Sequence, residues 1–139
     1  MKKRVLFICA GNSARSIIAE ALLRYHSGAF FEVASAGTSP EPVDIRAISA
    51  LKRFGIPIQG LYSKSLDEVS NQSFDLVITL CDKSQREYVP SPTHSKIIAW
   101  DFEDPATRHC FNPFYTTVRE LSTRIKLFAL VQTKTAKAA

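Results

Sequence analysis

The chain has 139 residues and a formal net charge of +5, and 45% of its residues are hydrophobic and 22% charged. This length is close to the commonest domain size, so we expect a single domain over residues 1–139, with residues 132–139 as a loose tail. The composition excludes a disordered chain, and no apolar run approaches the roughly 20 residues of a membrane helix. Five of the eighteen basic residues lie at the two ends, which predicts a solvated surface and no nucleic-acid or membrane partner.

The N-terminal residues and the cysteines predict a cytoplasmic protein. The apolar run at residues 5–8 is shorter than the core of a secretory signal peptide, and residues 11–13 end it abruptly. The three cysteines, Cys9, Cys81 and Cys110, are odd in number and widely spaced. This pattern disfavours a disulfide scaffold and favours at least one thiol with a chemical role.

Helices are predicted where apolar residues recur at three- and four-residue steps. The first begins at residues 13–16 and carries Tyr25 on its apolar face. The second has Ile45 on its apolar face and Gly55 as its C-terminal cap. Ser65, with an acidic residue three positions later, is expected to cap a short helical turn.

The last helix is the best specified by the sequence. Asn112 is the expected N-cap and Pro113 the first helical residue. One apolar stripe then follows, formed by Phe114, Val118, Leu121, Ile125 and Phe128. Before this helix, the polar segment at residues 82–93 is expected to be an excursion containing one turn of helix.

Strands are predicted at four short apolar runs, residues 5–8, 30–36, 74–80 and 96–100. Because they alternate with helices, we predict a doubly wound α/β fold with a four-stranded, mostly parallel sheet and helices on both faces. In such a sheet the carboxyl ends of the strands share one edge, where ligands bind. Cys9, residues 35–37, Cys81 and Asp104 each follow a strand, so we expect them to face one pocket.

Cys9 is the strongest candidate for a catalytic residue. It lies between a strand and a helix N-terminus, where a tight loop leaves backbone N–H groups free to bind an anion. Arg15 follows six positions later, so its guanidinium can reach the same anion and stabilise a thiolate. A buried structural cysteine would leave Arg15 and the polar residues 11–13 unexplained. We therefore predict a nucleophile that attacks a tetrahedral oxyanion.

A departing oxygen must be protonated, and a carboxylic acid on a loop at the same edge can supply the proton. Asp104 is our candidate, and composition alone leaves Asp101 and Glu103 as rivals.

The two other cysteines have less certain places in this chemistry by sequence alone. Cys81 is either a core residue or a second thiol that attacks the Cys9 adduct. Cys110 could pair with a neighbouring histidine or act as a metal ligand, but a surface or structural role is favoured. No metal site is predicted.

The loop sequence resembles a known family. Residues 9–16, Cys-Ala-Gly-Asn-Ser-Ala-Arg-Ser, are similar to the corresponding loop of the low-molecular-weight protein tyrosine phosphatases and of the arsenate reductases that share their fold. Other stretches resemble the same family: residues 19–20, 35–38, 63–66, 75–82 and 100–105. The resemblance covers the chain from about Arg4 to Ala106 and, more loosely, the last helix.

The resemblance implies a role for each matching position. Cys9 is the implied nucleophile, Arg15 and the loop amides hold the oxyanion, and Asp104 is the acid, in preference to its acidic neighbours. In the loop, Asn12 is expected to shape the backbone and Ser16 to hydrogen-bond the thiolate. The implied oxyanion-binding residues are Ala10, Gly11, Asn12, Ser13, Ala14 and Ser16.

Two features resemble the reductase branch, namely Cys81 at the end of its strand and Ala106-Thr107 where the tyrosine phosphatases carry aromatic residues. One feature departs from the three-cysteine reductases, because Tyr88 stands near the position of their third cysteine. Ala14 also occupies a position where many relatives have a second cysteine. Some relatives bind a monovalent cation near the loop with help from an acidic residue close to Ser65.

The resemblance therefore implies an arsenate reductase that reduces arsenate to arsenite. Cys9 attacks arsenate, Cys81 attacks the adduct, and an outside thiol system such as glutathione, glutaredoxin or thioredoxin completes the reduction, with no tightly bound cofactor. The alternative is a phosphatase that hydrolyses phosphomonoesters, including phosphotyrosine proteins, through a cysteinyl-phosphate. A catalytically idle phosphate-binding module is disfavoured by the intact set of Cys9, Arg15 and Asp104.

Overall fold

The computed structural model describes residues 2–87 and 96–138. Its elements are β1 (Lys3–Cys9), α1 (Arg15–Ser27), β2 (Phe31–Gly37), α2 (Ile45–Arg53), the 3-10 helix η1 (Leu66–Val69), β3 (Leu76–Thr79), α3 (Asp82–Glu87), β4 (Ile97–Ala99) and α4 (Pro113–Ala138). Residues 88–93 of the predicted excursion, including Tyr88, lie outside the described residues, and its first half, residues 82–87, forms α3. Across the described ranges, no helix combines the length and apolarity needed to cross a membrane.

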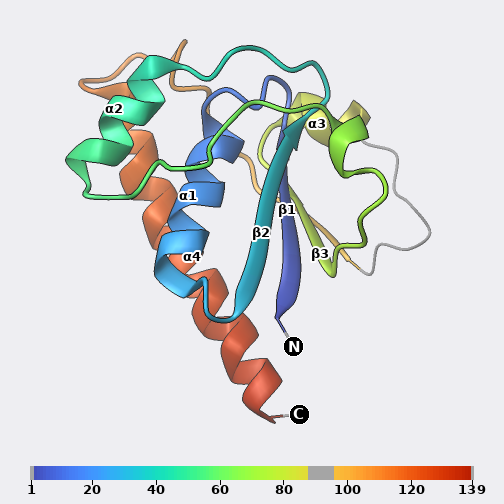
Figure 1. Ribbon diagram of the computed structural model, residues 1–139. Coiled ribbons are helices and arrows are strands. Elements are labelled where there is room, and N and C mark those ends of the chain that lie inside the picture. Colours follow the sequence, from blue (N-terminus) through green and yellow to red (C-terminus); the bar gives the residue numbers. More distant parts are fainter. Residues whose placement is uncertain (1, 88–95, 139) are drawn as a thin grey trace.

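The four strands form one sheet in the order β2-β1-β3-β4, and every neighbouring pair is parallel. This confirms the predicted α/β fold. The register pairs Cys9 with Gly37 and Thr79 with both Ile8 and Ala99, so all four strands end at the same edge (Figure 1). The segments that follow the strands therefore meet at that edge, as expected for parallel strands.

The central strand β1 is buried on both faces of the sheet. Its side chains alternate, as they must in a strand, between two hydrophobic clusters. Val5 and Phe7 pack in the larger cluster, which contains buried apolar residues of both α1 and α4, and these two helices lie together on one side of the sheet (Figure 1). Leu6 and Ile8 belong to a smaller cluster with Val69 at the end of η1.

The predicted stripe of α4 is confirmed, because all five of its apolar side chains are buried. The helix also continues to Ala138, where the sequence predicted a loose tail. One contact that supports this extension is a hydrogen bond of 2.8 Å from Lys3 Nζ to Gln132 Oε1, which joins the start of β1 to the last turns of α4.

The apolar faces of the first two helices differ from the prediction. Tyr25 is 57% exposed because it lies in the last turn of α1, beyond the helix residues that pack into the core. Ile45 is 79% exposed because the buried face of α2 is set by Ala47, and residues two positions apart point to opposite sides of a helix. Ser65 precedes η1 but makes no side-chain capping bond.

Gly37, at the end of β2, lies against the loop that follows β1. A Cβ at this position would lie 2.7 Å from the carbonyl oxygen of Ala10 and 3.0 Å from both Cβ and N of Asn12. Two of these three atoms are backbone, so rotation of a side chain cannot relieve the overlap.

We therefore expect Gly37→Ala to destabilise the protein by about 1–3 kcal/mol, as overpacking usually does, and to displace the loop. Urea unfolding followed by circular dichroism measures the first effect. Ser49→Ala, at an exposed position of α2, serves as the control and should leave the midpoint unchanged. Equal midpoints for Gly37→Ala and the unmodified protein would contradict this packing argument.

Candidate active site

The loop between β1 and α1 has its carbonyl groups turned toward the segment after β2. Three backbone hydrogen bonds fix it: Ser39 N to Ala10 O at 2.8 Å, Glu41 N to Gly11 O at 2.8 Å, and Asp44 N to Ser13 O at 2.9 Å. Within the described ranges, no amide from Gly11 to Ala14 donates a hydrogen bond to the protein. These N–H groups are therefore available to bind an anion.

Asn12 holds the loop in its shape. It is fully buried and has a positive φ of 49°, a conformation that few residues other than glycine adopt. Its side chain compensates with three hydrogen bonds. Nδ2 donates to Ser16 Oγ at 2.7 Å and to Ser35 Oγ at 2.9 Å, and Oδ1 accepts from the Lys64 amide at 2.9 Å.

Cys9 and Ser16 contact each other directly, with 2.8 Å between Sγ and Oγ. Because Ser16 Oγ already accepts a hydrogen bond from Asn12, its own hydrogen is free to point at the sulfur. This is the contact that the family resemblance implies for Ser16.

A buried ionic network around Glu20 is connected to the Asn12 side chain through Ser35. Ser35 Oγ donates to Glu20 Oε1, so the hydrogen bonds run from Asn12 through Ser35 to a buried carboxylate. The charge of Glu20 is balanced by Arg24 and by Lys64, whose Nζ lies 3.7 Å from Glu20 Oε1. The sequence analysis missed this pairing. The sequence signal was an acidic residue within the apolar part of α1.

Arg15 and Asp104 approach each other above the loop. Arg15 Nη2 lies 3.9 Å from Asp104 Oδ2, and Arg15 Nη1 donates to the Phe102 carbonyl at 2.9 Å. The other carboxylate oxygen of Asp104 accepts from the Ala106 amide at 2.9 Å. Both side chains are thus held in place by backbone groups of the loop after β4.

These residues surround a cavity of about 160 Å³, whose size suits a small oxyanion. It is lined by Cys9, Ala10, Gly11, Ser13, Ala14, Arg15, Ser39, Glu41, Lys83 and Asp104. Asn12 and Ser16 lie buried behind the loop and do not line it. Of the three acidic candidates, Asp104 alone is among the lining residues, and Glu103 instead pairs with Arg108.

The sequence analysis also missed Lys83, Ser39 and Glu41. Lys83 brings a second cation to the anion cavity, and its position two residues after Cys81, beyond the end of β3, was the available signal. Glu41 places a carboxylate at the rim, near Gly11.

Cys81 does not line this cavity. It is 8% exposed and lies directly before α3, where its sulfur accepts a hydrogen bond from the Ser84 amide at 3.4 Å. Ser84 Oγ in turn donates to the carbonyl of Ile8, one residue before Cys9 along β1. Cys110, by contrast, is exposed on the loop before α4.

Comparison with known proteins gives a consistent assignment. The family model for low molecular weight phosphotyrosine protein phosphatase matches residues 4–137. An arsenate reductase of Brevibacillus brevis is 37% identical over 129 residues, which cover 92% of this chain and 95% of that protein.

Two solved structures resemble the present one. A low molecular weight protein tyrosine phosphatase from T. tengcongensis superposes with a TM-score of 0.76 at 30% identity, covering 95% of this chain and 99% of that chain. A thioredoxin-dependent arsenate reductase of Corynebacterium glutamicum gives a TM-score of 0.77 at 28% identity, covering 96% of this chain and 63% of that chain. The chain therefore belongs to the low molecular weight phosphotyrosine protein phosphatase family, as an enzyme similar to the arsenate reductases of that family.

Proposed function

We propose that this protein reduces arsenate to arsenite in the cytoplasm, with Cys9 as nucleophile and an external thiol system as reductant. The observation that carries the proposal is the small cavity that Cys9 lines together with Arg15, Lys83 and Asp104. The 37% identity to an arsenate reductase supports the reductase branch. Ala106 and Thr107, both exposed, also support it because neither offers an aromatic surface for a phosphotyrosine ring.

In the first step, the Cys9 thiolate attacks the arsenic of bound arsenate. Arg15, Lys83 and the loop amides neutralise the remaining oxygens, and this electrostatic stabilisation is commonly the largest contribution to such reactions. Asp104 donates its proton to the departing oxygen, which leaves as water. The product is a cysteinyl-arsenate adduct in which arsenic is still pentavalent.

In the second step, a thiolate attacks the sulfur of the adduct. A disulfide forms, the sulfur–arsenic bond breaks, and its electron pair reduces arsenic to arsenite. We assign this attack to Cys81, which must leave its hydrogen bond with Ser84 because its sulfur does not line the cavity. An outside thiol such as glutathione, glutaredoxin or thioredoxin then reduces the disulfide.

Phosphatase activity is the second candidate function, because the first step is chemically the same for phosphate esters. Water instead of a thiol then resolves the cysteinyl-phosphate. The similarity to the T. tengcongensis phosphatase, at 30% identity, supports this activity, and we expect both activities from one site.

The acid is tested by comparing two neighbouring carboxylates. Asp104→Asn should lower arsenate reduction and p-nitrophenyl phosphate hydrolysis by about 10²–10⁴-fold, since general acid catalysis contributes that much. Glu103→Gln is the matched control, because Glu103 lies next in sequence but does not line the cavity. An equal loss in both variants would refute the assignment to Asp104, and Cys9→Ser should abolish both activities.

The second thiol is tested by Cys81→Ser. This variant should lose most thiol-dependent arsenate reduction yet keep p-nitrophenyl phosphate hydrolysis, because only the second step of reduction needs the Cys81 sulfur. If arsenate reduction stays at the unmodified rate, an external thiol attacks the adduct directly and Cys81 is a structural residue.

The contact between Cys9 and Ser16 is tested by rapid alkylation with iodoacetamide at pH 6. In a Cys81→Ser, Cys110→Ser background, only Cys9 can react. Removing the hydroxyl in Ser16→Ala should slow labelling by about tenfold or more, since hydrogen bonds to charged groups contribute about 1.5–3 kcal/mol. An unchanged labelling rate would show that Ser16 does not stabilise the thiolate.

A further inference from the structure

The Cys9 cavity contains a carboxylate that the chemistry described above does not use. Glu41 lies on the segment between β2 and α2 and lines the cavity together with Cys9. Its amide donates to the carbonyl of Gly11 at 2.8 Å, which attaches this segment to the anion-binding loop. Its side chain lies close to the same residue, because a Cβ placed on Gly11 would be 3.4 Å from Glu41 Oε2 and 3.1 Å from Ser13 Oγ. The carboxylate is therefore at the edge of the loop whose amides are available to an anion.

A second negative charge at an anion cavity needs a reason, because it repels the ligand. The other carboxylate of the cavity, Asp104, is the acid that gives up its proton, and it lies 3.9 Å from Arg15. Glu41 has no such partner. In the described part of the chain it forms no ion pair, although Arg15 and Lys83 line the same cavity, and its side chain accepts no hydrogen bond. The carboxylate of Glu41 is therefore available to a bound ligand.

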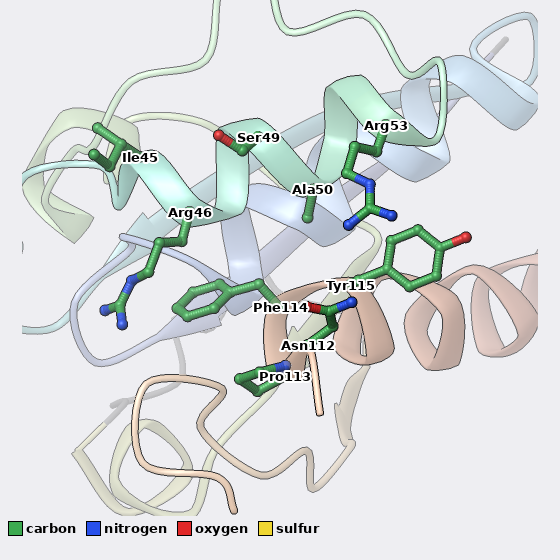
Figure 2. Close-up of a pocket in the computed structure, with 9 residues that line it drawn as sticks. All are labelled: Ile45, Arg46, Ser49, Ala50, Arg53, Asn112, Pro113, Phe114 and Tyr115. Atoms are coloured by element: carbon green, nitrogen blue, oxygen red, sulfur yellow. The ribbon is translucent and has the colours of Figure 1, made fainter. Parts of the chain in front are cut away.

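A larger cavity between α2 and the start of α4 offers a comparison. Its volume is about 420 Å³, and Figure 2 shows Arg46 and Arg53 among the nine residues that line it. None of these nine residues is acidic. Such a lining attracts a small anion by charge alone, because it has no carboxylate that could distinguish a protonated anion from an unprotonated one. The Cys9 cavity, which includes Glu41, can make that distinction.

The charged and backbone groups around the Cys9 cavity are of two kinds. The free loop amides, the guanidinium of Arg15 and the ammonium of Lys83 can only donate hydrogen bonds. The ionised carboxylate of Glu41 can only accept one. An anion that satisfies both kinds of group has unprotonated oxygens and at least one hydroxyl. Near neutral pH, arsenate and phosphate keep at least one proton, whereas sulfate and the dianion of a phosphate ester keep none.

We propose that Glu41 is a specificity-determining residue that accepts a hydrogen bond from the hydroxyl of a protonated inorganic oxyanion. The unprotonated oxygens bind the loop amides, Arg15 and Lys83, which leaves the hydroxyl at the rim, where Asp104 protonates it and it leaves as water. Sulfate and ester dianions have no hydrogen to donate, so the charge of Glu41 repels them and selects against them. This inference deepens the proposed function and rests on it, because it makes inorganic arsenate a better ligand than a phosphate ester.

The test measures how well phosphate and sulfate protect Cys9 from iodoacetamide at pH 7 and constant ionic strength. Mass spectrometry of the peptide that contains Cys9 gives the labelling rate. This readout needs no turnover, and an anion bound at Arg46 or Arg53 does not affect it. In the unmodified protein, the concentration that halves the labelling rate should be at least about tenfold lower for phosphate than for sulfate, the scale of one hydrogen bond to a charged group.

Glu41→Gln keeps the shape of the side chain, removes its charge and adds a donor. The half-protecting concentration should therefore rise for phosphate and fall for sulfate, so that their ratio changes by about tenfold. The matched control is Glu32→Gln, the same substitution at an exposed position at the start of β2, the opposite end of the strand from Gly37. Glu41→Ala, which removes the acceptor altogether, should reduce the preference for phosphate in the same direction.

Three results would overturn the role of Glu41: an unchanged ratio in Glu41→Gln, an equal change in Glu32→Gln, or equal protection by the two anions in the unmodified protein. In turnover, Glu41→Gln should raise the KM for arsenate and lower the KM for p-nitrophenyl phosphate. A protein that reduces no arsenate with any thiol, but whose protection ratio depends on Glu41, would contradict the proposed function and leave the role of Glu41 standing. If neither anion protects Cys9, both are wrong.

Discussion

The structure depends above all on the left-handed backbone of Asn12. This residue is buried at the bend of the loop, and its side chain is bound on three sides by Ser16, Ser35 and the Lys64 amide. Those bonds connect the loop to α1, to β2 and to the segment before η1. One of these partners, Ser16, also contacts the sulfur of Cys9 through its hydroxyl oxygen at 2.8 Å. Local strain in the loop is thus balanced by a network that also reaches the sulfur of Cys9 through Ser16.

The same network explains why buried charges lie so close to the catalytic loop. Glu20 is a buried carboxylate whose cost is offset by Lys64, Arg24 and the hydroxyl of Ser35. Such ion pairs contribute little net stability, but they define one arrangement of the groups that surround them. Here the defined group is the Asn12 side chain. The anion cavity consequently has a fixed shape before any substrate enters.

The fold and the position of the Cys9 loop could be predicted from the sequence because both depend on local patterns. Short apolar runs that alternate with helical patterns indicated a parallel sheet. The spacing of Cys9 and Arg15 indicated a loop that binds an anion. Asp104 was separated from its neighbours only by family resemblance, since the path of an irregular loop is not encoded in a short pattern. The pairing of Glu20 with Lys64 joins residues far apart in sequence, so no periodicity reveals it. The exposure of Ile45 was missed because it depends on how α2 docks on α4.

The most direct test of the account is the stoichiometry of arsenate reduction by the purified protein. We predict that two thiols are oxidised for each arsenite released, because the electrons reach arsenic through a disulfide that forms when the Cys9 adduct is cleaved. Arsenite can be quantified by ion chromatography and thiols by titration, with Cys9→Ser as the blank. Hydrolysis of p-nitrophenyl phosphate without any arsenite formation, under every thiol system, would contradict the account and assign the protein to phosphate-ester hydrolysis.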